Sequence, residues 1–273
     1  LPHISNFTDF MPLEQHPLLS VRYVQSPRQL GAPDVGLMTM SEMVERAKDM
    51  CAAVSVPVIC DGDTGFGNVV NLVRTVREYE RAGAAAIQLE DQTTPKKCGH
   101  MLGRQVVDAE EMVNKIRAAA AARQDPDFLI IARTDARTNH GVEEAIRRAR
   151  LYEQAGADII FVESLESVEE MRMVNEAIAK PTIANMVETG RTPLLTAAQL
   201  QEIGYDMVVF PISALFVAAK AVYDMLMDLR ANGTTRNCLD EMMSFSQFND
   251  FIGLPLVREL EENRFDSVAK KLR

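Results

Sequence analysis

The sequence predicts an α/β protein of 273 residues folded as a (β/α)8 barrel of the TIM type. Short apolar segments recur at spacings of roughly 23 to 45 residues, and a helix follows each one, as in successive βα units. The segments are continuously apolar, which is typical of parallel strands buried on both faces. No GxGxxG follows the first strand and no GxxxxGKS/T occurs, so the Rossmann and P-loop folds lose their main support. We therefore expect one barrel domain over residues 1–273.

Six strands are expected from apolar runs bounded by turn or helix signals. They cover Pro57–Asp61, Ala86–Glu90, Leu129–Arg133, Asp158–Glu163, Pro181–Asn185 and Met207–Phe210. Amphipathic helices over 71–83, 142–155 and 196–203 each run into one of these strands. A glycine stands at each join: Gly83, Gly156 and Gly204. Glycine is the residue that a left-handed helix C-cap requires, so each helix is predicted to end there.

The two ends of the chain depart from this pattern. Residues 1–30 show neither helical nor strand periodicity, so the first βα unit is expected to be atypical or incomplete. Residues Ala214–Gly233 carry an apolar stripe at helical spacing and predict one long helix. The helical extension 234–273 holds more apolar side chains than a solvated tail exposes, Phe245 and Phe248 among them. We expect this extension to pack against another subunit.

The composition excludes several partners. A net charge of −10 and a pI near 5.0 leave no basic face to release counterions from nucleic acid. No run reaches the roughly 18 apolar residues of a membrane-spanning helix, and the first residues lack the order of a signal peptide. The four cysteines show no CxxC spacing, which fits a reducing compartment. We expect a cytoplasmic protein with no nucleic-acid or membrane partner.

Polar residues stand where the apolar strands end. They are Asp61, Asp63, Glu90, Asp91, Arg133, Asp135, Glu163 and Asn185. In a (β/α) barrel the carboxyl ends of all strands meet at one mouth, where active sites lie. Carboxylates gathered there repel one another, and a hard cation such as Mg²⁺ relieves the repulsion by taking their oxygens as ligands. The alternative is that single acids, such as Asp61 or Asp135, only cap the helix that follows.

The segment Lys96–His100, Lys-Lys-Cys-Gly-His, places a thiol beside two cations and a histidine. Nearby positive charge lowers the pKa of a thiol, which suits it to proton transfer or nucleophilic attack. A lone cysteine is more often an inert small apolar residue, and we interpret Cys51, Cys60 and Cys238 in that way. The polar setting of Cys98 favours a chemical role instead.

Seven motifs in order make the chain resemble the isocitrate lyase and phosphoenolpyruvate mutase superfamily, from about Gly31 to Phe265. They begin at Gly31 (GAPDVG), Asp61 (DGDTGFG), Gln88 (QLEDQ), Lys96 (KKCGH), Ala132 (ARTD), Phe161 (FVE) and Asn185 (NMVE). Within that superfamily the chain is similar to the small lyases typified by 2-methylisocitrate lyase and 2,3-dimethylmalate lyase. The resemblance implies a (β/α)8 barrel whose last helix is exchanged between subunits, a homotetramer built as a dimer of dimers, and a bound Mg²⁺ or Mn²⁺.

The resemblance also implies a role for each matched residue. Asp61, Asp63 and Glu90 would hold the metal directly or through water, and Asp34 would support that shell. Cys98, on a loop that closes over the site, would be the general acid that protonates the departing carbon. Catalysis would further involve His100, Arg133 and Glu163. Substrate binding would involve Lys96, Gly99 and Asn185.

The reaction implied is cleavage of a carbon–carbon bond in a 2-hydroxy di- or tricarboxylate of the 2-methylisocitrate or 2,3-dimethylmalate type. Its products would be a 2-oxo acid such as pyruvate and a second carboxylic acid. Two alternatives on the same scaffold stay open: hydrolysis or decarboxylation of oxaloacetate, and a carboxyphosphonoenolpyruvate phosphonomutase-type step. A third alternative is a degenerate, non-catalytic barrel, which the atypical residues 1–30 motivate. The Cys-Gly-His triplet at Cys98 favours a lyase over a mutase.

Overall fold

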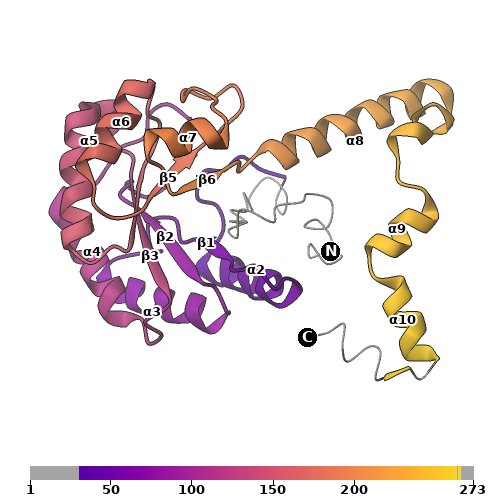
Figure 1. Ribbon diagram of the computed structural model, residues 1–273, viewed down its shortest axis with the longest axis horizontal. Helices are drawn as coiled ribbons and strands as arrows, with labels where there is room; N and C mark the ends of the chain where they lie inside the picture. The colour runs from indigo at the N-terminus through magenta and orange to yellow at the C-terminus, as the bar shows by residue number, and fades with distance from the viewer. Residues whose placement is uncertain (1–30, 263, 266–273) are drawn as a thin grey trace. The chain divides into compact units, whose positions relative to one another are not determined.

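A curled, six-stranded parallel sheet is built from residues 59–209, and its strands pair in the order of the chain (Figure 1). This computed structural model describes residues 31–262, 264 and 265. The strands are β1 (Ile59–Asp61), β2 (Ala86–Glu90), β3 (Leu129–Thr134), β4 (Ile159–Val162), β5 (Thr182–Asn185) and β6 (Met207–Val209). All six predicted strands are confirmed, and in the described part of the chain they make a half-barrel. Residues 1–30, where we predict an atypical first βα unit, lie outside the described residues.

A helix follows every strand, which confirms the predicted βα repeat. The helices after β1 to β6 are α3 (Val69–Arg81), α4 (Ala109–Ala122), α5 (Arg137–Gln154), α6 (Val168–Ala177), α7 (Ala197–Ile203) and α8 (Ser213–Asn232). Helix α2 (Met40–Ala53) precedes β1. Figure 1 shows α3 to α6 along the outer side of the sheet. None of the described helices is long and apolar enough to cross a membrane.

The three predicted glycine joins adopt the backbone conformation for which glycine is expected. Gly83, Gly156 and Gly204 have φ angles of 90°, 108° and 113°, all in the left-handed region. Gly204 is itself the C-cap of α7, whereas α3 and α5 are capped one residue earlier by Ala82 and Ala155. The left-handed residue reverses the chain at the end of the helix, so the next strand begins a few residues later.

One face of the sheet carries an apolar cluster, which we call the floor. Its members are Ile59, Ala86, Ile131, Ile159, Phe161, Ile183 and Val209. Side chains alternate along a strand, so the residue two positions after a floor residue points to the same side. Asp61, Arg133, Glu163 and Asn185 each stand two positions after a floor residue. The strand-end polar residues therefore stand on the floor, at the mouth of the half-barrel.

A buried carboxylate ties β2, β3 and α5 together. Asp91 accepts hydrogen bonds from Thr134 Oγ1 and Tyr152 OH, each at 2.7 Å. It also accepts the backbone N–H of Asp135 at 2.9 Å, and Arg148 lies 3.2 Å away as its positive partner. Asp91, one of the strand-end acids, thus holds the fold together and fixes the backbone at the end of β3.

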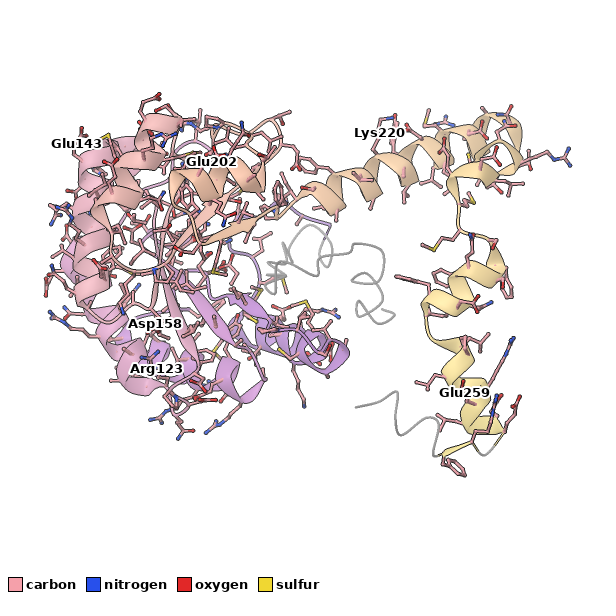
Figure 2. All side chains as sticks on the ribbon, viewed as in Figure 1. Arg123, Glu143, Asp158, Glu202, Lys220 and Glu259 are labelled. Carbon is pink, nitrogen blue, oxygen red and sulfur yellow. The ribbon has the colours of Figure 1, made fainter. Side chains whose placement is uncertain are left out.

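The amino ends of β3 and β4 are joined by a second ion pair, far from the mouth. Asp158 accepts hydrogen bonds from Arg123 Nη1 at 2.5 Å and from the N–H of Ile130 at 2.9 Å (Figure 2). Arg123 also donates to the carbonyl of Phe128 at 2.9 Å. This ion pair lies at the amino ends of the strands, whereas the site residues lie at their carboxyl ends.

The chain divides into two compact units, one holding the sheet and one formed mainly by the C-terminal helices. The second unit contains most of α8, the 3-10 helix η2 (Arg236–Glu241), α9 (Phe245–Phe251) and α10 (Leu254–Glu261). Helix α8 confirms the long helix predicted over Ala214–Gly233 to within one residue. Val217 and Phe245 are 71% and 87% exposed. Packing of these helices against another subunit, and exchange of the last helix, stay predictions.

Truncation of a floor residue should destabilise the sheet unit. Ile131 is fully buried, so Ile131→Ala is expected to leave a cavity and lower the free energy of unfolding by about 2–5 kcal/mol, measured by urea denaturation. Val70→Ala is the control, because the Val70 side chain is 74% exposed and should contribute less than about 0.5 kcal/mol. Equal losses in the two variants would contradict the assignment of the floor as the core.

Candidate active site

Carboxylates and one lysine meet at the ends of β1 and β2. The N–H of Asp63 donates to Asp61 Oδ1 at 2.9 Å, which closes a tight turn after β1. The Nζ of Lys96 lies 2.9 Å from Asp63 Oδ1 and 2.8 Å from Asp34 Oδ1. Glu90, at the end of β2, is 1% exposed. The structure thus places an ammonium group among the carboxylates that the resemblance assigns to a metal.

Burial makes the carboxyl groups of Asp63 and Glu90 hard to ionise. Burial, and then the charge of Asp61, raise the pKa of Asp63 to about 6, although Lys96 opposes the shift. Burial also raises the pKa of Glu90 well above its usual range, against the opposing charges of Arg133 and Lys96. Burial alone would lower the pKa of Lys96, but the surrounding carboxylates hold that pKa raised. The lysine therefore stays charged, while the acids would gain from further positive charge.

The donor set suits a hard cation held partly through water. Asp61, Asp63 and Glu90 offer the oxygen ligands that Mg²⁺ takes, and Glu90 Oε1 is buried without a hydrogen-bond partner among the described residues. Within the described part of the chain, no three His, Cys, Asp or Glu side chains converge closely enough to enclose an ion directly. Mg²⁺ usually binds one or two carboxylates and keeps several waters, so a partly water-mediated site fits these residues.

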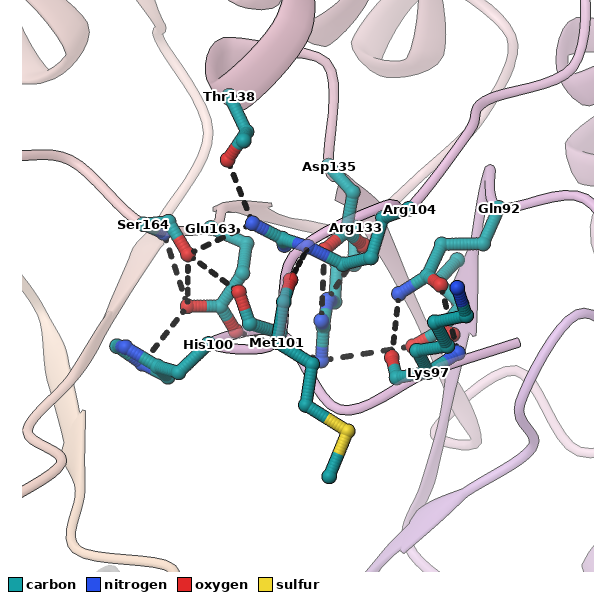
Figure 3. A network of polar contacts seen from close by, with 12 residues as sticks. Gln92, Lys97, His100, Met101, Arg104, Arg133, Asp135, Thr138, Glu163 and Ser164 are labelled. Carbon is teal, nitrogen blue, oxygen red and sulfur yellow. Dashed lines mark hydrogen bonds and ion pairs between the residues drawn. The ribbon is translucent and has the colours of Figure 1, made fainter. Parts of the chain in front are cut away.

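The loop that carries Cys98 is folded down onto the strand ends. The N–H of Cys98 donates to the carbonyl of Asp34 at 3.1 Å. Gln92 clamps the loop, because its amide donates to the Lys97 carbonyl and accepts the Lys97 N–H, each at 2.9 Å (Figure 3). These three bonds fix the backbone N–H and carbonyl of Lys97 and the backbone N–H of Cys98.

The pKa of the Cys98 thiol is raised, which corrects the expectation that the neighbouring lysines lower it. Burial is the main cause, and a backbone hydrogen bond at His100 opposes it. The two lysines act elsewhere: Lys96 Nζ pairs with carboxylates, and Lys97 Nζ donates to the Gly103 carbonyl at 3.1 Å. The thiol therefore keeps its proton at neutral pH, as a general acid must.

His100 joins this loop to the segment that follows β5. Its Nδ1 accepts the backbone N–H of Arg191 at 3.1 Å, so we place its proton on Nε2. Nε2 lies 3.4 Å from Glu163 Oε1 but makes no aligned hydrogen bond among the described residues. Burial lowers the pKa of His100, although the charge of Glu163 opposes the shift. The result is a neutral imidazole with an N–H that a ligand could accept.

Arg133 is a fixed positive charge at the centre of the site. Its Nε and Nη2 each donate to the Asp135 carboxylate at 2.9 Å, and its Nη1 lies 3.4 Å from both Glu90 Oε2 and Glu163 Oε2. Its guanidinium carbon stands 5.3 Å from the centroid of the Phe161 ring, which belongs to the floor. Burial would raise the pKa of Asp135, but Arg133 holds it low. Each member of this pair thus favours the ionised form of the other.

Glycine is required where the loop crosses these charged groups. A Cβ on Gly99 would lie 2.6 Å from Arg133 Nη2 and 2.7 Å from Glu163 Oε2. Real Cβ atoms do not approach other heavy atoms so closely, so any side chain at this position would push the loop away. Gly99 thus sets how near the loop backbone comes to Arg133 and Glu163.

Buried polar atoms without a hydrogen-bond partner gather at the mouth. Among the described residues they include Gln88 Nε2, Glu90 Oε1, His100 Nε2 and Asn185 Oδ1. The amide nitrogen of Asn185 is used, since it donates to Glu163 Oε2 at 3.0 Å. Buried polar groups in proteins are normally satisfied, so these atoms point to a polar ligand at the mouth.

A hollow of about 790 Å³ reaches Asp63 and Lys96 from the side of α2, α3 and α4. Cys98, His100 and Arg133 do not line it. Asp63 and Lys96 are therefore accessible from this hollow, whereas Cys98, His100 and Arg133 lie away from it.

The structure brings all the predicted site residues together at the mouth through the contacts above. They are Asp34, Asp61, Asp63, Glu90, Lys96, Cys98, Gly99, His100, Arg133, Glu163 and Asn185. Sequence analysis missed Gln92, Arg104 and Ser164, which hold the Cys98 loop (Figure 3). Ser164 directly follows Glu163 at a strand end, and that position was a usable signal. Arg104 lies in an irregular segment, and no pattern around it indicates burial.

Known proteins similar to this chain identify its family. The family described as phosphoenolpyruvate phosphomutase matches residues 25–230. The 2,3-dimethylmalate lyase of Eubacterium barkeri is 56% identical over 241 residues, covering 88% of this chain and 83% of that one. The 2-methylisocitrate lyase of Aeropyrum pernix is 49% identical over 224 residues, covering 82% of this chain and 72% of that one.

Solved structures agree with this assignment. A crystal structure of 2,3-dimethylmalate lyase matches with a TM-score of 0.82 at 36% identity, covering 88% of this chain and 80% of that one. Oxaloacetate acetylhydrolase with 3,3-difluorooxalacetate gives 0.81 at 33%, covering 88% and 82%. Phosphonopyruvate hydrolase with oxalate and Mg²⁺ gives 0.76 at 33%, covering 86% and 82%. This chain belongs to the phosphoenolpyruvate mutase/isocitrate lyase superfamily, as its motifs predict. Relatives named as lyases support the prediction of a carbon–carbon lyase.

The raised pKa of Asp63 predicts a pH-dependent stability of the metal-free protein. Its folded-state pKa of about 6 exceeds an unfolded value of about 3.9, so folding favours the protonated form. The stability from this group is full below about pH 4 and is lost as the pH rises through about 6. Between pH 5 and 7.5 we expect this group to lower the wild-type free energy of unfolding by about 1 kcal/mol.

Asp63→Asn should lack this contribution, because the amide does not titrate. Urea denaturation of both proteins in EDTA at the two pH values measures the difference. The same pH dependence in wild type and variant would show that Asp63 has an ordinary pKa.

Proposed function

We propose that this protein is a metal-dependent lyase that cleaves the carbon–carbon bond of a 2-hydroxy di- or tricarboxylate of the 2,3-dimethylmalate or 2-methylisocitrate type. The observation that carries the proposal is a buried mouth where the protonated Cys98 thiol, the Arg133 guanidinium and unsatisfied polar atoms face a carboxylate cluster. Identities of 56% and 49% to lyases named for these two substrates support it. The products would be a 2-oxo acid such as pyruvate and a second carboxylic acid.

The substrate would be held by groups that the protein leaves unsatisfied. The His100 Nε2–H and the guanidinium of Arg133 are donors for substrate carboxylates, and Arg133 is already oriented by Asp135. The Asn185 Oδ1 is an acceptor for the substrate hydroxyl, because its amide nitrogen is fixed on Glu163. These groups orient the bond to be broken before reaction, which lowers the entropic part of the barrier.

Asp61, Asp63 and Glu90 would hold Mg²⁺ or Mn²⁺, directly or through water, with Asp34 behind them. When bound, the ion would supply positive charge that favours loss of the proton from the 2-hydroxyl of the substrate. Lys96 pairs with both Asp34 and Asp63, and so it holds Asp63 at the edge of the hollow. A relative solved with oxalate and Mg²⁺ supports the choice of a divalent ion.

The Cys98 thiol would supply the proton that completes the cleavage. The Glu163 carboxylate, which accepts the Asn185 amide at 3.0 Å, would first take the proton of the substrate hydroxyl, so that the 2-oxygen becomes a carbonyl as the carbon–carbon bond opens. The electron pair of that bond passes to the departing enolate or aci-carboxylate carbon. That carbon takes the proton from sulfur, leaving a thiolate beside the positive charge of Arg133. Gly99 brings the loop close enough for this transfer, and the covering loop keeps water from the departing carbanion.

The substrate class is tested by a lactate dehydrogenase-coupled assay for 2-oxo acid release. We expect 2,3-dimethylmalate or 2-methylisocitrate to be cleaved with Mg²⁺ and not with EDTA, and isocitrate completes the panel. If the folded, Mg²⁺-supplemented protein releases no 2-oxo acid from any of the three, the proposed reaction is wrong.

A second candidate, hydrolysis of oxaloacetate, is favoured by the similarity to oxaloacetate acetylhydrolase at a TM-score of 0.81. Release of oxalate and acetate from oxaloacetate would identify that hydrolase. Release of pyruvate, beyond the uncatalysed rate, would identify a decarboxylase on the same scaffold.

Cys98→Ser tests the general acid directly. We expect kcat to fall by roughly 10²–10⁴-fold, because a serine hydroxyl is a far weaker acid than the thiol, while Mg²⁺ affinity measured by calorimetry stays near that of wild type. Cys51→Ser is the matched control and should change kcat less than about twofold, since Cys51 lies on α2, away from the Cys98 loop. Unchanged turnover in Cys98→Ser would remove the thiol from the mechanism.

We also propose that the chain completes a single (β/α)8 barrel domain in the cytoplasm, assembled as a dimer of dimers with its last helix exchanged. The exposed apolar side chains of α8 and α9 support such an assembly, since soluble chains seldom leave so many uncovered. Sedimentation equilibrium would report a tetramer, and a monomer at micromolar concentration would contradict it.

A further inference from the structure

Arg104 is a buried arginine that holds the Cys98 loop directly at Met101 and through Ser164 at Gly99 (Figure 3). It is 2% exposed, and its Nε donates to the Met101 carbonyl at 3.1 Å. Its Nη2 lies 3.3 Å from Ser164 Oγ, and Ser164 Oγ lies 2.6 Å from the carbonyl oxygen of Gly99. The carbonyls of Gly99 and Met101 flank His100, so Arg104 holds the turn that carries the imidazole and follows the thiol.

The direction of these hydrogen bonds follows from what each group can donate. A guanidinium has donors only, so Ser164 Oγ must be the acceptor of the bond from Arg104. A hydroxyl has a single hydrogen, and the Gly99 carbonyl can only accept it. Arg104 therefore orients the Ser164 hydroxyl toward Gly99, and the loop is held by a relay of two directional bonds.

The other side of Arg104 reaches the group that orients Arg133. Its Nη1 donates to Asp135 Oδ1, the same oxygen that accepts Arg133 Nη2 at 2.9 Å. All three side chains are nearly fully buried. One carboxylate thus joins a guanidinium that holds the loop to a guanidinium that faces Glu163.

We propose that Arg104 is a positioning residue that sets the place of Cys98 and His100 relative to Arg133. The proposal rests on the proposed function, in which these three residues act on one substrate. The alternative is a purely structural role, in which Arg104 only joins β3 to α5. Its Nη2 also donates to Thr138 Oγ1 on α5 at 2.5 Å. The two readings differ in which hydroxyl matters: Ser164 leads to the loop, and Thr138 does not.

Substitutions at Arg104 should lower kcat more than they raise KM. Misplacement of a reacting group by about 1 Å costs on the order of 10² in rate, so we expect Arg104→Met to lower kcat by about that factor. Arg104→Lys should fall in between, since one ammonium can pair with Asp135 but cannot also reach Met101 and Ser164 in a planar fork. KM should change less than about threefold, because Arg104 touches no predicted substrate-binding atom.

Ser164→Ala and Thr138→Val form the matched pair that separates the readings. Each removes one hydroxyl that accepts from Arg104 Nη2. We expect Ser164→Ala to lower kcat by roughly tenfold and Thr138→Val by less than about twofold, which follows from loss of loop placement in the first variant only. Equal effects, or a double variant Arg104→Met/Ser164→Ala whose losses simply multiply, would overturn the relay.

Alkylation of Cys98 provides a readout that needs no substrate. In wild type, Arg104→Met, Ser164→Ala and Thr138→Val, the rate of Cys98 modification by iodoacetamide is measured by peptide mass spectrometry. We expect it to rise severalfold in the Arg104 and Ser164 variants, whose loop is released, and to stay near wild type in Thr138→Val, with Cys238 as the internal reference.

The cleavage assay and the alkylation rates distinguish failure of the proposed function from failure of the positioning role. If wild type cleaves none of the proposed substrates but alkylation follows this pattern, the proposed function fails and the loop relay stands. If wild type is active while Cys98 alkylates equally fast in all four proteins, the positioning role of Arg104 is wrong and the lyase stands.

Discussion

The alternation of side chains along parallel strands is the constraint on which both the core and the site depend. Parallel pairing in register aligns floor residues such as Ile131 and Ile159 on one face of the sheet. Two positions further along each strand, the same face presents a polar side chain, such as Arg133 beyond Ile131. A one-residue slip in the register of any strand would turn both its polar residue and its floor residue toward the helices. The chemistry of the mouth is thus bound to the packing beneath it.

Much of the fold was predictable because its strands are apolar and a glycine marks the end of several helices. Each predicted glycine join, such as Gly204, ends in the left-handed turn that only glycine makes freely. The helices that sequence analysis left unassigned lack that signal. Helices α4 and α6 are followed by the C-cap residues Arg123 and Ile178, which are extended rather than left-handed. The C-terminal extension was predictable as helical, but not how its apolar side chains are covered.

The sequence was enough to predict which residues form the site, but not the pKa values of their side chains. Strand ends converge whatever the details, so acids such as Asp61 and Glu90 could be placed together from their positions alone. The pKa of Cys98 could not be predicted from adjacent lysines, because Lys96 turns away to a carboxylate 62 residues earlier in the chain. Arg104 was beyond reach for a similar reason. Its partners are distant in sequence, and only the folded chain brings them to its side chain.

The Arg133–Asp135 pair divides the mouth into a half of constant charge and a half that titrates. On one side, burial would raise the pKa of Asp135 and lower that of Arg133, but each group holds the other ionised, so the charge of this pair is the same in mild acid and in mild base. On the other side, burial raises the pKa of Asp63 to about 6 and also raises the pKa of Glu90. Protonation in mild acid would therefore change the charge of the Asp63 half of the mouth before that of the Arg133–Asp135 half.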